Sequence, residues 1–419
     1  MRMLGLFTTE ISKVLTVPRL RPNRSNSMLL LNGRIHPRAD SAAVVAALLI
    51  QGGRVIWVGE PGELDIPYSN SGIVLDLGGR TVLPGLIDAH LHLEHYASRL
   101  SLLDCEQPSL ADCLTRVRAQ AERTEEGAWI LGHGWDQNLW GGYPSAADLD
   151  QVSPIHPAYL TAKSLHAAWA NSKGLELARI NASTPDPADG AIQRSADGSP
   201  TGILFEGAMR LISDLIGRPA IGQRLESLAR AQARLLSLGL TGVHDFDGPS
   251  CFEALQLLRE AERLQLRVVK NLPVELLAEL QAAGFRTGFG DEWIRLGHIK
   301  VFADGALGPR TASMLSPYAG EPGNRGMLLV DHEGLADIAI RAAQAGLATS
   351  VHAIGDQATH EVLGAFSTLR DYEAANQLPH LRHRIEHLQL LHPDDSGRAG
   401  ALNLVASMQP VHATSDMPM

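Results

Sequence analysis

The stretch VLPGLIDAHLH, residues Val82–His92, ends an apolar run with two histidines placed two positions apart. In a β-strand, residues i and i+2 point to the same face, so His90 and His92 would present their ring nitrogens side by side. One metal ion can bridge two nitrogens at that separation. An isolated HxH pattern is a weak signal, and two ordinary polar residues at a strand end remain the alternative.

Other strand-like runs of the chain also end in a candidate ligand. HIKVFADG carries Lys300, LATSVHAIGD carries His352 and LRHRIEHLQ carries His387, and a loop or helix follows each run. In a parallel barrel the carboxyl ends of the strands meet at one rim, so residues far apart in sequence would lie together there. This repetition predicts a metal site at the rim.

The hydrophobic period changes near residue 80. Residues 28–81 consist of short β-rich runs separated by Gly, Asn and Pro, which predicts a small antiparallel sheet, one half of a β-sandwich domain. From Val82 to Met419, apolar strand-like runs alternate with long helical patterns, which indicates an α/β fold with a parallel sheet. Near 105–222 the alternation gives way to Gly/Pro-rich loops, which suggests an insertion. We expect residues 1–27 to form a disordered tail.

Composition excludes several classes of partner. The formal net charge of −10 and the pI near 5.9 argue against nucleic acid, which needs clustered cations, and favour a small neutral or weakly charged substrate. Three scattered cysteines predict buried thiols in a reducing cytoplasm. No apolar run is long enough to cross a bilayer. We therefore expect a cytoplasmic protein with no nucleic-acid or membrane partner, and a homodimer is left open.

A series of motifs resembles a known family. The series is VLPGLIDAHLH, GAWILGHGWD, LHAAWANSKGLELA, GSPTGILFEGAM, GLTGVHDFD, IKVFADGALGPRTA, VHAIGDQATHEVL, RIEHLQLLHPDD and ASMQPVHATSD. In this order it is similar to the amidohydrolase superfamily, amidohydrolase-3 branch, from about Leu29 to the last residue. The resemblance implies a (β/α)8 TIM-like barrel with a small β-sandwich. It also implies one or two divalent metals, commonly zinc, and hydrolysis of C–N bonds other than peptide bonds.

Carried over residue by residue, the resemblance makes His90 and His92 ligands of the buried metal, and His352 and His387 ligands of a second. Lys300 matches a lysine that many members carboxylate to bridge both ions. Metal-activated hydroxide would attack a carbonyl of the substrate. The resemblance places eight residues near the substrate: His133, Trp135, Asp136, His166, Glu206, Asp304, Arg310 and His412. Alternatively, Trp135 and His166 pack the insertion, Glu206 caps a helix and Arg310 pairs with Asp304.

The chain departs from the family pattern at its end. Seven strand motifs can be counted, the last in ASMQP, and the sequence stops at Met419. The family continues to an eighth strand whose aspartate is a metal ligand and shuttles the proton, and Asp416 is a poor substitute for it. We therefore expect an incomplete barrel of about seven strands without an assigned catalytic base. Two classes stay open: a metal-dependent amidohydrolase, or a catalytically incompetent, truncated remnant that binds metal or ligand only.

Overall fold

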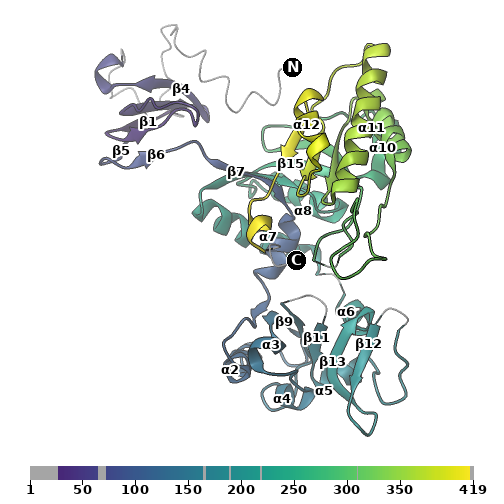
Figure 1. The fold of residues 1–419 in the computed structure, drawn as a ribbon. Coiled ribbons are helices and arrows are strands. Elements are labelled where there is room, and N and C mark those ends of the chain that lie inside the picture. Colours follow the sequence, from purple (N-terminus) through teal and green to yellow (C-terminus); the bar gives the residue numbers. More distant parts are fainter. Residues whose placement is uncertain are drawn as a thin grey trace. The chain divides into compact units, whose positions relative to one another are not determined.

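The computed structural model describes residues 27–64, 72–163, 167–187, 190–217, 219–308 and 310–415. Except for Ser27, the predicted tail, residues 1–27, lies outside these ranges. The chain folds as two compact units (Figure 1). The first unit takes its described residues from Met1–Leu91, Arg234–Phe252 and Leu264–Met419, and the second from His92–Ala233 and Glu253–Arg263.

The N-terminal part of the first unit is a small β-structure. Its four-stranded sheet has the order β4-β3-β1-β5, with β1 Ser27–Leu31, β3 Ala47–Gln51, β4 Arg54–Gly59 and β5 Ile73–Asp76. A short 3-10 helix, η4 (Pro61–Glu63), follows β4, and β2 (Arg34–Ile35) pairs with β6 (Thr81–Val82). The β3–β4 hairpin turns at Gly52 and Gly53, whose positive φ angles of 58° and 76° suit a tight turn between antiparallel strands. The predicted antiparallel pairing holds for β1–β3 and β3–β4, whereas β1–β5 and β2–β6 are parallel.

A seven-stranded sheet dominates the rest of the first unit. Its order is β19-β18-β17-β16-β15-β14-β7, and every neighbouring pair is parallel. The strands are β7 Leu86–Leu91, β14 Leu240–Asp245, β15 Arg267–Pro273, β16 Ile294–Phe302, β17 Ala348–Ala353, β18 Arg384–His387 and β19 Val405–Ser407. These are the seven strands that the motifs predicted, in the same order.

Helical segments connect successive strands, as the alternating pattern predicted. The connections contain α7 Ile221–Ser237 and α8 Pro249–Glu260, most of whose residues belong to the second unit, and η7 Val274–Leu276, α9 Leu277–Ala282, α10 His332–Gln344, α11 Asp356–Ala375, η8 Pro393–Asp395 and α12 Arg398–Ala401. The helix α13 Val411–Ser415 follows the last strand, β19. The Asp331 side chain caps α10 by accepting from the Gly334 amide. Gly346, with φ +73°, follows that helix and turns the chain into β17.

The core of the barrel lies between the sheet and its outer helices. Ile299 and Val351 on the strands pack in one cluster with Leu363 and Phe366 of α11. All six residues of β17 are buried, as expected for a central parallel strand covered on both faces. Full burial of each such side chain contributes about 1.5–3 kcal/mol, so this cluster fixes the strands whose ends carry the candidate ligands.

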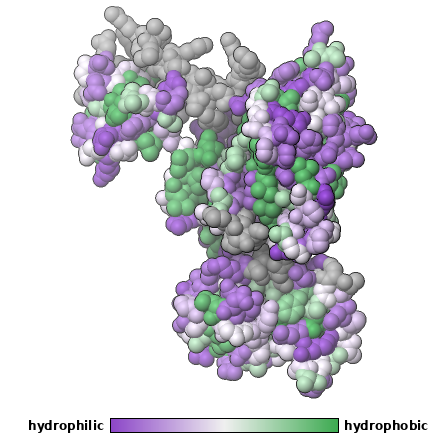
Figure 2. Space-filling view, in the orientation of Figure 1, coloured by the Kyte–Doolittle hydropathy of each residue, from purple (hydrophilic) through white to green (hydrophobic). Residues whose placement is uncertain are grey.

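The sheet curls into an incomplete barrel. Arg384 on β18 donates to the carbonyl oxygen of Ala89 on β7 (2.8 Å) and to Ser407 Oγ on β19 (2.9 Å). One side chain therefore spans the interior between both ends of the sheet. The edge strand β7 exposes Leu86 and Ile87, and Figure 2 shows apolar surface gathered on this unit. The predicted fold class, an incomplete TIM-like barrel of seven strands with an N-terminal β-domain, is confirmed.

The second unit is a separate α/β structure. Its sheet has the order β12-β13-β11-β10-β9-β8, with β8 Leu103–Asp104, β9 Ile130–Trp135, β10 Ala158–Ala162, β11 Ala167–Ala170, β12 Gly190–Arg194 and β13 Pro200–Glu206. Its further helical segments are α1 Leu93–Arg99, α2 Leu110–Ala121, α3 Gln137–Trp140, α4 Ala146–Asp150, α5 Ser172–Leu177, η6 Gly207–Met209 and α6 Arg210–Ile216. The predicted insertion, near 105–222, falls within this unit. The sequence indicated mainly loops there, but the structure has a sheet with a buried core around Trp135 and Trp169.

No helix within the described ranges is both long enough and apolar enough to cross a lipid bilayer.

Candidate metal centre

Four of the five predicted ligands lie at the carboxyl ends of barrel strands. His90 is near the end of β7, Lys300 near the end of β16, and His352 and His387 near the ends of β17 and β18. The strand register sets Phe302 beside His352 and Ala353 beside His387. Parallel pairing therefore brings residues almost 300 positions apart to one rim.

Three of these histidines form a continuous cluster of rings. The ring centroid of His387 lies 4.7 Å from that of His90 and 4.6 Å from that of His352. His412 extends the row, with its centroid 5.5 Å from that of His387. The His387 backbone has φ +72°, a left-handed conformation that is uncommon outside glycine and is found at functional sites. The structure thus places His387 at the centre of the cluster.

The hydrogen bonds of these rings determine which nitrogen would carry a lone pair. His387 Nδ1 lies 2.6 Å from Gln409 Oε1, and His352 Nε2 lies 2.8 Å from the carbonyl oxygen of Gly305. A carbonyl oxygen only accepts hydrogen bonds, so the contacted nitrogen of His352 must bear the proton. Gln409 Oε1 is likewise an acceptor, so His387 Nδ1 bears the proton of that contact. In the neutral rings, the lone pair is then on Nε2 of His387 and on Nδ1 of His352.

Burial keeps these imidazoles neutral at pH 7. Burial and the nearby Lys300 lower the pKa of His352 to about 4, and burial together with His352 lowers the pKa of His387 to about 3. Metal ligands must be deprotonated, and a neutral imidazole meets that requirement. Both histidines are therefore in the protonation state that a metal needs.

Lys300 is a buried amine without a partner. Its Nζ has no hydrogen-bond acceptor among the described residues and faces the rings of Phe302 (4.7 Å to the centroid) and Phe246 (5.1 Å). Burial lowers the pKa of Lys300 to about 8. With that pKa, roughly one molecule in ten carries a neutral, nucleophilic amine at pH 7. A buried lysine with these properties can react with carbon dioxide, as the metal-bridging role requires.

His90 is held by two neighbours in the same unit. Its Nδ1 lies 2.7 Å from Glu386 Oε2, and its ring stacks on Phe246 at a centroid distance of 4.1 Å and an angle of 14°. Glu386 also accepts from Arg384 Nε (2.7 Å) and Ser350 Oγ (2.5 Å). Burial alone would raise the pKa of Glu386, but the bonds from His90 and Arg384 lower it well below its usual range. Glu386 is therefore an ionised carboxylate.

The donors present fit a divalent metal in type. Neutral imidazoles suit zinc, and a carbamate on Lys300 would add the hard anionic oxygens that imidazoles lack. The ring nitrogens of the three histidines are adjacent but are not gathered at one point. Among the described residues, one group of His, Cys, Asp or Glu has all its ligand atoms within 4.8 Å: Asp245, Asp247 and Cys251. There the Lys270 ammonium already contacts Asp245 Oδ2 (2.5 Å) and the Asp247 carbonyl, so a protein cation fills that position.

The comparisons with known proteins show the family of this chain. Residues 74–419 match the model of the amidohydrolase family, in its amidohydrolase-3 branch. The chain belongs to the amidohydrolase family. It is accordingly a metal-dependent hydrolase, and the resemblance found in the motifs is confirmed.

The similarity to known proteins extends over most of this amidohydrolase chain. It is 33% identical over 403 residues to the protein LONG AFTER FAR-RED 3 of Arabidopsis thaliana, covering 93% of this chain and 69% of that protein. It is 28% identical over 380 residues to the N-substituted formamide deformylase of Arthrobacter pascens, covering 85% of this chain and 68% of that protein. Among solved structures, an uncharacterized metal-dependent hydrolase from Pyrococcus furiosus matches with TM-score 0.76 and 30% identity, over 93% of this chain and 78% of that one. Family membership supports metal-dependent hydrolysis of carbon–nitrogen bonds in general.

His92 differs from the strand pattern expected for it. The strand β7 ends at Leu91, and His92 is the N-cap residue of α1, with an exposed side chain. By the division of the chain it opens the second unit. His92 therefore lies outside the strand, so strand periodicity does not place its ring beside that of His90. The pairing of the two histidines rests on the family resemblance.

Two of the predicted substrate residues lie on β9 in the second unit. His133 Nδ1 lies 2.8 Å from Thr161 Oγ1, and burial lowers the pKa of His133. Trp135 is fully buried and donates from Nε1 to the Leu160 carbonyl oxygen (2.7 Å). It packs near Trp140, Tyr143 and Trp169, as the packing alternative expected.

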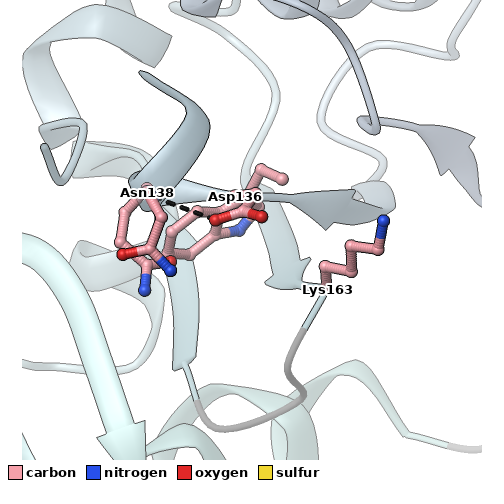
Figure 3. Close-up of a pocket in the computed structure, with 5 residues that line it drawn as sticks. Asp136, Asn138 and Lys163 are labelled. Carbon is pink, nitrogen blue, oxygen red and sulfur yellow. Dashed lines mark hydrogen bonds between the residues drawn. The ribbon is translucent and has the colours of Figure 1, made fainter. Parts of the chain in front are cut away.

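Trp135 also lines a pocket of about 220 Å³ in this unit, together with Asp136, Gln137, Asn138 and Lys163 (Figure 3). Asp136 Oδ1 accepts from the Asn138 amide (2.9 Å) and caps α3. Lys163 forms an ion pair with Glu106. Asp136 and Lys163 therefore already have partners, a backbone amide and the Glu106 carboxylate.

The remaining predicted residues have mixed surroundings. Arg310 pairs with Glu321, so the alternative of a pair with Asp304 is wrong. The Asp304 carboxylate accepts from the amides of Ser313, Ile354 and Gly355, which anchor the loop after β16, and burial raises its pKa. Glu206 is an exposed residue of the second unit with φ +47°. His166 and Asp416 lie outside the described residues.

Sequence reasoning missed Arg384, Glu386 and Gln409, which contact or orient the cluster. The signal for the first two was present, because two charged residues at i and i+2 in the short strand RIEH must both point to one buried face. Buried charges of this kind need partners, and the ring of a predicted ligand is one of them.

Proposed function

We propose that this amidohydrolase hydrolyses an amide-type carbon–nitrogen bond in a small molecule, with one or two divalent metal ions, zinc first among them. His90, His92, His352 and His387 would hold the metal together with a carboxylated Lys300. The observation that carries the proposal is the cluster of neutral histidine rings at the strand ends beside the unpartnered amine of Lys300.

The bound metal would supply Lewis-acid polarisation of the substrate carbonyl and a water molecule of lowered pKa. The chain's own residues prepare that site. Low imidazole pKa values keep His352 and His387 unprotonated at neutral pH, and their hydrogen bonds to Gly305 and Gln409 set which nitrogen faces the metal.

Lys300 would be modified before the metal binds. Its neutral Nζ attacks the carbon of carbon dioxide, an N–C bond forms, one C=O π pair moves to oxygen, and one proton leaves to solvent. The product is a carbamate with two oxygens. The lack of a hydrogen-bond acceptor among the described residues and the pKa of about 8 favour this reaction, because burial outweighs the opposing effect of the Glu386 charge.

The substrate class we favour is an N-acyl or N-formyl amine. The similarity to the N-substituted formamide deformylase of Arthrobacter pascens supports this choice, with 68% of that protein covered. The general base stays unassigned. Asp304 is a weak candidate because three backbone amides already occupy its oxygens.

Zinc content and hydrolysis of N-formyl and N-acyl amines, measured on the purified 419-residue chain, test the proposal. We expect bound zinc in the wild type and its loss in His387→Ala. His360→Ala is the matched control, because His360 is half exposed and pairs with Asp395 outside the cluster. Equal zinc content in His387→Ala and the wild type would overturn the proposed site. Zinc binding without hydrolysis would favour the binding-only alternative.

A further inference from the structure

Two residues of β18 hold β7 at the position of His90. Arg384 donates to the carbonyl oxygen of Ala89 (2.8 Å), which fixes the backbone just before the histidine. Glu386, two residues further along β18, contacts His90 Nδ1 at 2.7 Å. The Phe246 ring stacks on the imidazole and fixes its plane. Backbone, ring plane and ring rotation of His90 are thus all constrained from within the barrel.

Several buried donors hold the Glu386 carboxylate in place beside His90. Glu386 is fully buried and His90 is 9% exposed in its side chain. The Arg384 guanidinium already neutralises Glu386 through Nε (2.7 Å) and Nη2 (3.2 Å), and Ser350 Oγ adds a hydrogen bond. The contact of His90 Nδ1 therefore ends on an oxygen of a firmly anchored carboxylate.

A carboxylate can only accept hydrogen bonds, so the shared proton of this contact belongs to His90 Nδ1. In a neutral imidazole the other nitrogen, Nε2, then carries the lone pair. A residue that fixes the tautomer and orientation of a metal ligand typically contributes 10–100-fold to metal affinity.

We propose that Glu386 is a positioning residue, which acts through His90 by holding it in the Nδ1–H tautomer with Nε2 directed to the metal. This inference rests on the proposed metal site. Arg384 and Ser350 serve it by keeping Glu386 ionised and in place. Glu386 touches neither substrate nor metal in this role.

Glu386→Gln tests the role, because an amide keeps the size of the side chain but can either donate to or accept from Nδ1. We expect a zinc affinity about 10–100-fold weaker than wild type in competition with a chromophoric chelator. Glu373→Gln is the matched control: Glu373 is a buried carboxylate of the same unit that bonds Arg370 and His383, outside the candidate cluster. Its zinc affinity should equal that of the wild type.

Proton placement is measured separately on the metal-free chain. Long-range proton–nitrogen NMR spectra with labelled histidine should show His90, assigned through His90→Ala, as the Nδ1–H tautomer in the wild type. The Glu386→Gln variant should show a mixture with the Nε2–H form. Thermal unfolding of both glutamate variants monitors folding.

The outcomes separate this inference from the proposed function. An Nε2–H tautomer in the wild type, or unchanged zinc affinity in a folded Glu386→Gln, overturns the positioning role. A wild-type chain that binds no zinc overturns the proposed function, while the expected tautomer change would still support proton placement by Glu386. Equal affinity losses in the Glu386 and Glu373 variants would show a general structural effect and overturn the inference.

Discussion

The barrel contains two buried lysines on adjacent strands, and their surroundings are opposite. Lys270 on β15 is fully buried, with its Nζ against the Asp245 carboxylate and the Asp247 carbonyl. Lys300 on β16 is almost as buried, yet its Nζ faces the rings of Phe302 and Phe246 and has no hydrogen-bond acceptor among the described residues. The register places Pro273, three residues after Lys270, beside Lys300.

The contrast separates a lysine that holds the fold from one that is available for chemistry. A carboxylate partner stabilises the ammonium form and makes the pair a fixed part of the core. Without such a partner, burial favours the neutral amine, which is a nucleophile. The residue type is the same and both side chains are buried, so the difference in partner distinguishes the two roles.

Breaking the ion pair between Lys270 and Asp245 should produce the largest change in the free energy of unfolding. Lys270→Met removes the ammonium that contacts the buried Asp245 carboxylate, and loss of one member of a buried ion pair costs about 3–5 kcal/mol. We expect this decrease in the free energy of unfolding in urea, measured on the metal-free chain. The double variant Lys270→Met with Asp245→Asn should recover most of it, since no buried charge remains. A single variant as stable as the wild type would contradict the pairing.

The stability of the metal-free chain should depend on pH through Lys300. The pKa of Lys300 is lowered to about 8 in the folded chain, against about 10.4 in the unfolded chain. Between these values the unfolded state binds more protons, so the free energy of unfolding rises with pH, by about 3 kcal/mol in all. Below pH 8 the lysine is charged in both states and its burial penalty is fully present.

The difference between wild type and Lys300→Met isolates this effect, because all other titrating groups are shared. We expect urea unfolding from pH 7 to pH 10.5, in buffer free of carbon dioxide, to show that the free energy of unfolding of the wild type rises with pH relative to that of the variant. A difference that stays flat over this range would mean that Lys300 is not desolvated.

Lys300→Met should also separate stability from function. At pH 7 we expect the variant to be at least as stable as the wild type, because an apolar side chain replaces an unpaired buried amine. Zinc affinity should fall by at least the roughly 10–100-fold that loss of a supporting residue costs. Labelled carbon dioxide should give a carbamate signal in ¹³C spectra of the wild type and none in the variant. A wild type without that signal would contradict carboxylation.

The sequence predicted the barrel well because its strands are buried on both faces. Continuous apolar runs such as ATSVHA, each followed by a helical pattern, leave few alternatives to a parallel sheet. The second unit was harder to predict. Its strands, such as AAWA and ILGHGW, are short and contain small residues or glycine, so the sequence pattern of this region indicates an insertion rich in loops, whereas the structure has a sheet around buried tryptophans.

For the site, sequence could place candidate ligands at strand ends but could not find their supports. His352 and His387 stand out because histidine is rare in an apolar strand. The partner of a side chain, in contrast, depends on register and on the curl of the sheet: Glu386 meets a residue 296 positions away. The same limit applies to the two lysines, which local sequence does not distinguish.

The smallest effect concerns the rings that face Lys300. Phe302 lies 4.7 Å from Nζ, and a cation–π contact of this kind stabilises an ammonium by about 0.5–1 kcal/mol at a partly exposed site. Phe302→Leu should therefore lower the pKa of Lys300 further, by about 0.4–0.7 units, as followed by the lysine ¹³Cε shift assigned through Lys300→Met. Phe289→Leu is the control, since Phe289 is also exposed but packs on Phe285. Lys270 Nζ contacts a carboxylate, whereas Lys300 Nζ contacts the faces of two aromatic rings. A pKa that rises or stays unchanged in Phe302→Leu would show that the ring does not stabilise the ammonium, and that burial alone sets the reactivity of Lys300.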